Sequence, residues 1–116
     1  MARVLVTEKI ADAGLDRLRA QGHEVDVSLA PSPEELLELI KGADALIIRS
    51  ATTVTAEVLE AGEDLKVVGR AGVGLDNVDI KAATAAGVMV VNAPTSNIIS
   101  AAELTVGHIL SLAQLG

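Results

Sequence analysis

The chain has 116 residues, of which 50% are hydrophobic and 22% charged, and this composition predicts one globular domain with a single core. Its net charge of −7 disfavours nucleic acid as a partner, and the lack of cysteine excludes disulfides and cysteine-ligated metals. No apolar run approaches the roughly 20 residues that span a bilayer, and no signal peptide is visible at the start. We therefore expect a cytoplasmic protein without a membrane partner.

Short β-branched runs alternate with alanine- and leucine-rich stretches, which predicts alternating strands and helices. In chain order we expect strand 3–7, helix 11–20, strand 24–29, helix 33–41, strand 45–48, helix 55–61, strand 65–69, helix 78–86, strand 88–91 and helix 97–115. Gly22 and Gly42 are stop signals after the first two helices, whereas Ser32 and Pro33 are start signals for the second. Residues 24–29 alternate charged and apolar side chains, which is typical of an edge strand.

The strict alternation of strands and helices, with continuous apolar strands, predicts a parallel sheet covered by helices on both faces. Right-handed crossovers leave few topologies for such a sheet. The favoured fold is α/β: a doubly wound, five-stranded parallel sheet of the flavodoxin-like order 2-1-3-4-5. We expect residues 1–116 to form this single domain, without internal repeats or linkers.

Polar residues follow several of the expected strands, and the carboxyl ends of parallel strands meet at one edge of a sheet. They are Thr7 and Glu8 after the first strand, Arg49 and Ser50 after the third, and Arg70 with the loop Gly72-Val73-Gly74 after the fourth. Backbone N–H groups of a glycine-rich turn can cradle an anion, and arginine adds a planar, permanently charged fork. The sequence therefore predicts a binding site for a small anionic molecule at this edge.

Other interpretations of these residues are less specific. The glycine loop can be an ordinary tight turn and the two arginines solvated strand ends. His23 and His108 have no acid or serine at catalytic spacing, and no metal-ligand cluster occurs, so we expect neither a catalytic residue nor a metal site. The lack of aromatic residues disfavours a flavin-binding module, and an arginine after the third strand disfavours a phosphate-accepting receiver domain.

Three segments, in order, resemble the D-2-hydroxyacid dehydrogenase family, and within it the phosphoglycerate dehydrogenases: LIIRSAT at 46–52, VGRAGVGLDNVD at 68–79 and VNAPTSNIISAAE at 91–103. The resemblance covers essentially the whole chain. It implies the N-terminal part of a flavodoxin-like substrate-binding domain, from an oxidoreductase of L-serine biosynthesis that uses NAD.

The resemblance also implies roles for individual residues. Arg49 and Arg70 would face the phosphate and the carboxylate of 3-phosphoglycerate, with Ser50 among the substrate-binding residues. Amides of the Gly72-Val73-Gly74 loop would bind the carboxylate near the nicotinamide, where Val73 touches the cofactor only through its main chain. Asn97 would line the same cleft.

The family's cofactor-binding half has no counterpart in these residues. No G-x-G-x-x-G followed by an acidic residue occurs at Rossmann spacing, and the family's catalytic histidine is not matched. Hydride transfer needs the cofactor, so we expect the Rossmann NAD domain to be absent and the chain alone to be inactive. The alternative is an engineered or reconstructed flavodoxin-like scaffold that binds no ligand.

The apolar stripe of the expected last helix, 97–115, has to be buried. The helix either packs on its own sheet, giving a monomer, or is exchanged between two chains, giving a homodimer.

Overall fold

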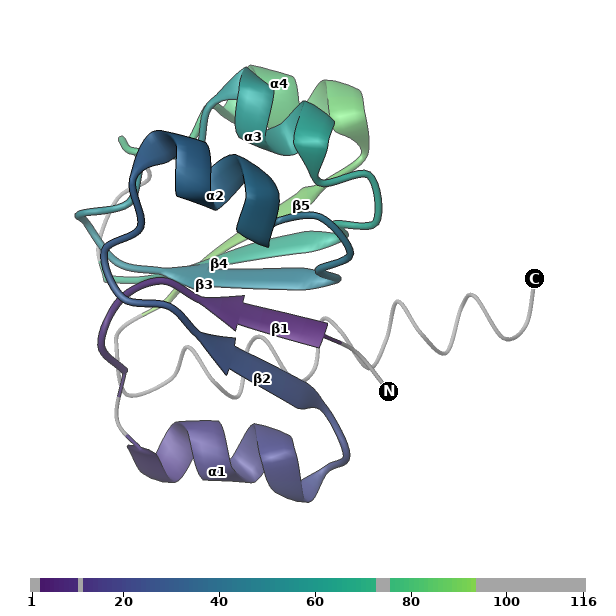
Figure 1. Cartoon of the computed structure of the whole chain (residues 1–116). Coiled ribbons are helices and arrows are strands. Elements are labelled where there is room, and N and C mark those ends of the chain that lie inside the picture. The colour runs from purple at the N-terminus through teal and green to yellow at the C-terminus, as the bar shows by residue number, and fades with distance from the viewer. Residues whose placement is uncertain (1–2, 11, 73–75, 94–116) are drawn as a thin grey trace.

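The computed structural model describes residues 3–10, 12–72 and 76–93, which fold into one parallel sheet with connecting helices (Figure 1). The strands are β1 Arg3–Val6, β2 Glu24–Val27, β3 Ala45–Ile48, β4 Val67–Ala71 and β5 Met89–Ala93. The helices are α1 Asp12–Ala20, α2 Pro33–Leu39, α3 Ala56–Ala61 and α4 Ile80–Ala86. The strand order β2-β1-β3-β4-β5 confirms the predicted α/β class and the flavodoxin-like topology.

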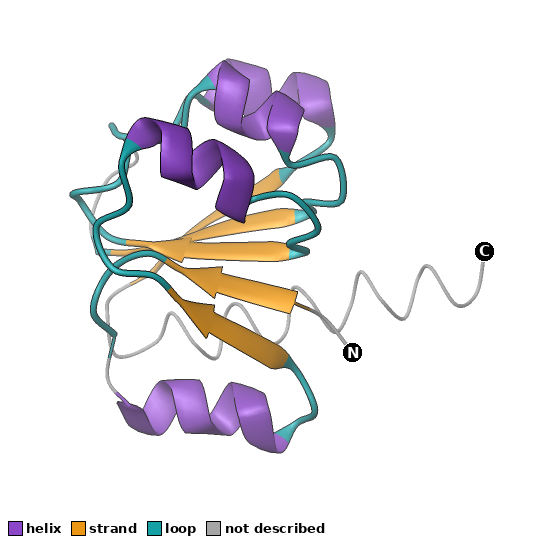
Figure 2. Ribbon diagram, in the orientation of Figure 1, coloured by secondary structure: helices purple, strands orange, loops and turns teal. Residues whose placement is uncertain are grey.

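The sheet lies between two layers of helices, as Figure 2 shows: α1 covers one face, and α2, α3 and α4 cover the other. Side chains alternate between the two faces along each strand. Val4 and Ile47 belong to the core under α1, whereas Leu5, Leu46 and Ile48 belong to the core under the other three helices. The central strands are therefore buried on both faces, which explains their uninterrupted apolar sequence.

Local sequence signals set where the helices begin and end. The Ser32 hydroxyl accepts a hydrogen bond from the Glu35 N–H at 3.2 Å, and the Glu35 carboxylate accepts one from the Ser32 N–H at 3.0 Å, so a reciprocal cap opens α2. Asp79 caps α4 by accepting a hydrogen bond from the Ala82 N–H at 3.0 Å. Gly87 ends α4 at a φ of 74°, which glycine adopts without strain.

Two boundaries differ from the expected ones near the predicted site. β4 continues to Ala71 rather than to residue 69, because Arg70 and Ala71 still pair with β5. Arg70 therefore belongs to the strand and not to the loop after it. α4 begins at Ile80 rather than at residue 78, because Val78 forms a parallel bridge with Val54 before the helix starts.

A third boundary differs at the edge of the sheet. β2 stops at Val27, two residues before the expected end, and it is the edge strand that its alternating sequence predicted. The expected last helix, 97–115, lies outside the described residues, so the choice between a monomer and an exchanged dimer stays a prediction. None of the helices that the structure describes is long and apolar enough to cross a membrane.

Replacing Leu46 with alanine should lower the free energy of unfolding by about 2–5 kcal/mol, because this side chain is 0% exposed and its loss leaves a cavity between sheet and helices. The matched control is Leu29→Ala, at a side chain that is 58% exposed, which should cost less than about 1 kcal/mol. Urea unfolding followed by circular dichroism measures both changes. Equal losses for the two variants would contradict the assigned core.

Candidate functional site

The loop that leaves the carboxyl end of β3 begins with two predicted site residues and is termed the 49–52 loop. The Glu8 carboxylate, just after β1, accepts hydrogen bonds from three backbone N–H groups of this loop. Its Oε2 accepts from Arg49 at 2.5 Å and from Thr52 at 3.1 Å, and its Oε1 accepts from Ala51 at 3.0 Å. Glu8 reaches the loop because β1 and β3 are neighbours in the sheet. It pairs with backbone donors that have no strand partner beyond the end of β3.

Asn77, in the segment after β4, holds the same loop from another side. Its Nδ2 donates to the carbonyl oxygen of Arg49 at 2.7 Å and to that of Thr52 at 2.6 Å. The backbone carbonyl oxygen of Asn77 accepts a hydrogen bond from the Val54 N–H at 2.8 Å, just beyond the loop. Both ends of the 49–52 loop are therefore fixed by a donor on Asn77 and an acceptor on Glu8.

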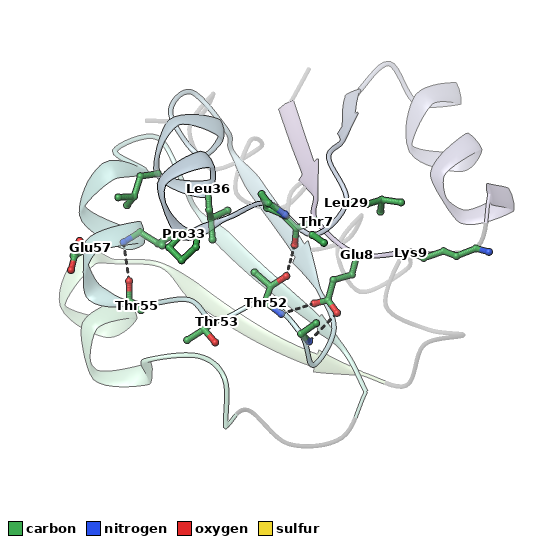
Figure 3. A pocket seen from close by; sticks show the side chains of 15 residues that line it. Thr7, Glu8, Lys9, Leu29, Pro33, Leu36, Thr52, Thr53, Thr55 and Glu57 are labelled. Carbon is green, nitrogen blue, oxygen red and sulfur yellow. Dashed lines mark hydrogen bonds between the residues drawn. The ribbon is translucent and has the colours of Figure 1, made fainter.

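A pair of buried hydroxyl groups lies under the loop. Thr7 and Thr52 are both buried, and their Oγ1 atoms are 2.8 Å apart. Figure 3 shows this pair next to the Glu8 carboxylate, which is turned toward the loop. Burying a hydroxyl costs free energy unless it is hydrogen-bonded, so each threonine lowers the cost of burying the other.

Arg70, the second predicted arginine, is half-buried at the end of β4 and lies against Gly72. A Cβ atom placed on Gly72 would be 3.5 Å from the Arg70 Nη1. Gly72 has a φ of 145°, and its N–H donates to the Ala93 carbonyl oxygen at 2.8 Å. A residue with a side chain would be strained at that φ, so the backbone requires glycine at this turn.

The two predicted arginines lie at the same edge of the sheet, but their guanidinium groups have different neighbours. Ile48 of β3 pairs with Arg70 of β4, so Arg49 is one residue beyond that pair. The Arg49 Nη1 donates to the Lys9 carbonyl oxygen at 3.4 Å, toward the loop after β1, whereas the Arg70 side chain lies against Gly72 after β4. The backbones of Arg49 and Arg70 are thus close to each other at the sheet edge, but their guanidinium groups contact different parts of the chain.

Ser50 is an exposed residue of the 49–52 loop. Val73, Gly74 and Asn97, the other predicted site residues, lie outside the described residues, and their roles stay predictions. The sequence placed Glu8 at this edge but gave it no individual role. It also gave no role to Asn77, which lies in the segment between β4 and α4. The available signal was the strand order, which puts the residue after the first strand next to the loop after the third.

A pocket of about 620 Å³ opens beside the 49–52 loop, between the sheet edge, α2 and α3 (Figure 3). It lies where the connections from β1 and β3 leave the sheet in opposite directions, the usual place for a ligand in this topology. Leu29, Pro33 and Leu36 contribute to its apolar wall, and Thr53 and Thr55 add hydroxyl groups. Of the residues that the sequence placed at this edge, Thr7 and Glu8 line the pocket. The described residues that the resemblance made substrate-binding, Arg49, Ser50, Arg70 and Gly72, are not among its lining residues.

The hydrogen bonds of the 49–52 loop change the acidity of Glu8. Burial raises the pKa of Glu8, but hydrogen bonds from the backbone of Ala51, Arg49 and Thr52 and from the Thr52 hydroxyl outweigh it, and the pKa lies below its ordinary value of 4.5. Because the folded-state pKa is the lower one, ionised Glu8 stabilises the fold above pH 4.5. This stabilisation is lost as the pH falls through the folded-state value.

The Glu8→Gln variant should be less stable than the unchanged chain at neutral pH, by about 1 kcal/mol, because glutamine offers one acceptor oxygen to three N–H groups. The difference should shrink as the pH falls through the folded-state pKa of Glu8, which lies below 4.5, because Glu8 itself then becomes protonated. Chemical unfolding at neutral and acid pH measures it. Glu63→Gln, at an exposed carboxylate before β4, is the matched control. A stability difference that is the same at both pH values would contradict the assigned role of the Glu8 charge.

Residues 4–111 match the family model described as D-isomer specific 2-hydroxyacid dehydrogenase, catalytic domain. Curated relatives include the D-3-phosphoglycerate dehydrogenase of Methanocaldococcus jannaschii, 50% identical over 114 residues, and D-3-phosphoglycerate dehydrogenase 2, chloroplastic, of Arabidopsis thaliana, 54% identical over 113 residues. The matches cover 98% and 97% of this chain, but 22% and 18% of the two relatives. The chain therefore spans about a fifth of the length of these relatives.

Solved structures share the fold of this chain. The 3-phosphoglycerate dehydrogenase of Entamoeba histolytica with bound NAD⁺ aligns with a TM-score of 0.73 at 34% identity, over 91% of this chain and 37% of that one. The PH0520 protein of Pyrococcus horikoshii OT3 aligns with a TM-score of 0.77 at 35% identity, over 80% of this chain and 28% of that one. The resemblance found in the sequence is confirmed, and the chain belongs to the D-isomer specific 2-hydroxyacid dehydrogenase family, within its catalytic domain.

Proposed function

We propose that residues 1–116 form a single flavodoxin-like unit, the N-terminal part of the substrate-binding domain of a D-3-phosphoglycerate dehydrogenase. Such an enzyme is an NAD-dependent oxidoreductase of L-serine biosynthesis. The ligand of this unit is a small phosphorylated 2-hydroxy acid of the 3-phosphoglycerate type. Family membership and relatives of this name at 50% and 54% identity support the proposal.

The observation that carries the proposal is the placement of Arg49 and Arg70 at one sheet edge with different neighbours. 3-Phosphoglycerate has a phosphate at one end and a carboxylate at the other. Two guanidinium groups at one edge with different neighbours suit such a two-ended anion better than a single compact one. Each guanidinium can bind a phosphate or a carboxylate through two parallel hydrogen bonds.

A comparison with Arg3, at the opposite edge, separates a structural arginine from one that is available to a ligand. The Arg3 Nε donates to Asp26 at 2.7 Å, and its Nη1 donates to the carbonyl oxygens of Leu39 at 3.2 Å and Lys41 at 2.8 Å. Arg49 is exposed, and within the described part of the chain its side chain donates one hydrogen bond, at 3.4 Å. A guanidinium has five N–H donors, so Arg49 retains donors for an anion.

The described residues do not fit a nicotinamide dinucleotide. The glycine turn after β4 lacks the dinucleotide fingerprint, and the Arg70 guanidinium lies beside Gly72, 3.5 Å from where a Cβ would lie. We therefore assign substrate binding, and not hydride transfer, to this chain by itself. Contact between the cofactor and the main chain of Val73 stays a prediction from the resemblance.

A scaffold without ligand binding, engineered or reconstructed from this family, is the alternative. The absence of Phe, Tyr and Trp in 116 residues favours it, because natural cores and binding sites normally use aromatic side chains. The two proposals differ in one measurable property, the saturable binding of 3-phosphoglycerate.

Arg49→Ala and Arg70→Ala should each weaken the binding of 3-phosphoglycerate by about 1–3 kcal/mol, because each removes charge-assisted hydrogen bonds to the anion. Titration calorimetry measures the change, which should shrink at high salt because the site is open to solvent. Arg17→Ala, at an exposed position of α1, removes the same charge away from the edge and should leave the affinity unchanged. Equal weakening by Arg17→Ala would contradict the site, and no binding by the unchanged chain would favour the scaffold.

A polypeptide of residues 1–116 should neither oxidise 3-phosphoglycerate with NAD⁺ nor enhance NADH fluorescence, because the described residues offer no dinucleotide site. A coupled absorbance assay and a fluorescence titration test the two parts. Saturable enhancement of NADH fluorescence, lost on denaturing the chain, would show that the assignment to substrate binding alone is wrong.

A further inference from the structure

We infer that Glu8 is a positioning residue for the proposed anion site: its carboxylate sets the backbone conformation from which Arg49 and Ser50 meet the ligand, and Asn77 sets the same conformation from the other side. The inference rests on the proposed function, because ligand binding is the task for which the 49–52 loop is held in place. Glu8 acts through the loop and does not itself contact the ligand.

The geometry gives the loop a single conformation. Three N–H groups of the 49–52 loop converge on the two oxygens of Glu8, and two of its carbonyl oxygens converge on the Nδ2 of Asn77. Arg49 and Thr52 each donate their N–H to Glu8 and each accept from Asn77 at their carbonyl oxygen, so turning either residue away would break a bond to both side chains. The side chains that leave this backbone, those of Arg49 and Ser50, inherit its orientation.

The charge of Glu8 makes the inference testable, because its electrostatic effect on anion binding and its effect through the loop conformation have opposite signs. A carboxylate close to an anion-binding arginine repels the incoming anion. Loss of that charge, taken alone, would strengthen the binding of 3-phosphoglycerate. Loss of the loop conformation would weaken it, since a displacement of about 1 Å can cost about 100-fold in a positioned site. We expect the second effect to exceed the first.

A role for Glu8 as an acid that meets a ligand in the neighbouring pocket fits the contacts less well. Glu8 lines the pocket, but both of its oxygens already accept hydrogen bonds from the 49–52 loop. Most of the acceptor capacity of the carboxylate is therefore already used by the backbone of the loop. Its oxygens are therefore assigned to the backbone.

The first experiment measures amide hydrogen exchange without any ligand, in the unchanged chain, in Glu8→Gln and in Asn77→Ala. Exchange at the amides of residues 49, 51 and 52 should become faster by about tenfold or more in Glu8→Gln, while the β4 amides of Val67 and Val68 should not change. Glu63→Gln removes the same charge at an exposed residue and should change neither set. Unchanged exchange in the 49–52 loop of Glu8→Gln would overturn the inference.

The second experiment titrates the same variants with 3-phosphoglycerate. Glu8→Gln should raise the dissociation constant by about 10- to 100-fold. Glu8→Asp keeps the charge but shortens the side chain, so it should also weaken binding, which a change in repulsion does not explain. Tighter or equal binding by Glu8→Gln would overturn the positioning role.

A double-mutant cycle links Glu8 to the arginine that it positions. Arg49→Ala should weaken binding less in the Glu8→Gln background than in the unchanged chain, because an arginine already displaced contributes less. Arg17→Ala should have no effect in either background. If the effects of Glu8→Gln and Arg49→Ala are simply additive, Glu8 does not act through Arg49 and the inference is wrong.

The two experiments separate the inference from the function on which it rests. If the unchanged chain binds no 3-phosphoglycerate, the proposed function fails and the role of Glu8 in binding fails with it, whatever the exchange rates are. If the unchanged chain binds the ligand and Glu8→Gln binds it equally well, the proposed function stands and the inference alone is overturned.

Discussion

The parallel pairing of β1 with β3 is the contact on which the geometry of the site depends. Its register, Val4 with Ala45 and Val6 with Ile47, brings the end of β1 beside the end of β3 and so places Glu8 next to the 49–52 loop. A strand that ends in a parallel sheet leaves N–H and C=O groups without a ladder partner. At this end, side chains from two other connections supply those partners. A shift of register by one residue would misplace Glu8, so the order of the loop follows from the sheet.

Electrostatics at the two edges of the sheet differ although the chain as a whole is acidic, with a net charge of −7. At the amino edge, Arg3 is neutralised by Asp26 and bound by backbone carbonyl oxygens. At the carboxyl edge, Arg49 is exposed, and the Glu8 carboxylate is stabilised by hydrogen bonds from three backbone N–H groups. Salt screens distant charges over about 8 Å at physiological ionic strength. Any affinity of this edge for an anion would therefore depend on these local groups more than on the net charge.

Patterns within single elements made most of the fold predictable. The apolar run 45–48 requires burial on both faces, and the alternating run 24–29 requires an edge, so the sheet order follows from few alternatives. The same order placed Arg49 and Arg70 at one edge. The extension of β4 through Arg70 depends on pairing with β5, and the reach of Glu8 to the loop depends on register. The pocket depends on how α2 and α3 pack. These are contacts between elements distant in sequence, which local patterns do not encode.

The hydrogen bonds that Glu8 and Asn77 make to the 49–52 loop have a consequence for the binding of a ligand. Ordering a flexible loop around a small anion consumes part of the binding free energy, about 1–2 kcal/mol for each residue whose backbone is fixed. Five hydrogen bonds, three accepted by Glu8 and two donated by Asn77, fix this loop when the chain folds, before any ligand arrives. The cost is then met in folding, by the same sheet that the apolar core stabilises. An anion at this edge would meet donors that are already in place, and its orientation would be set by the β1–β3 register rather than by the ligand.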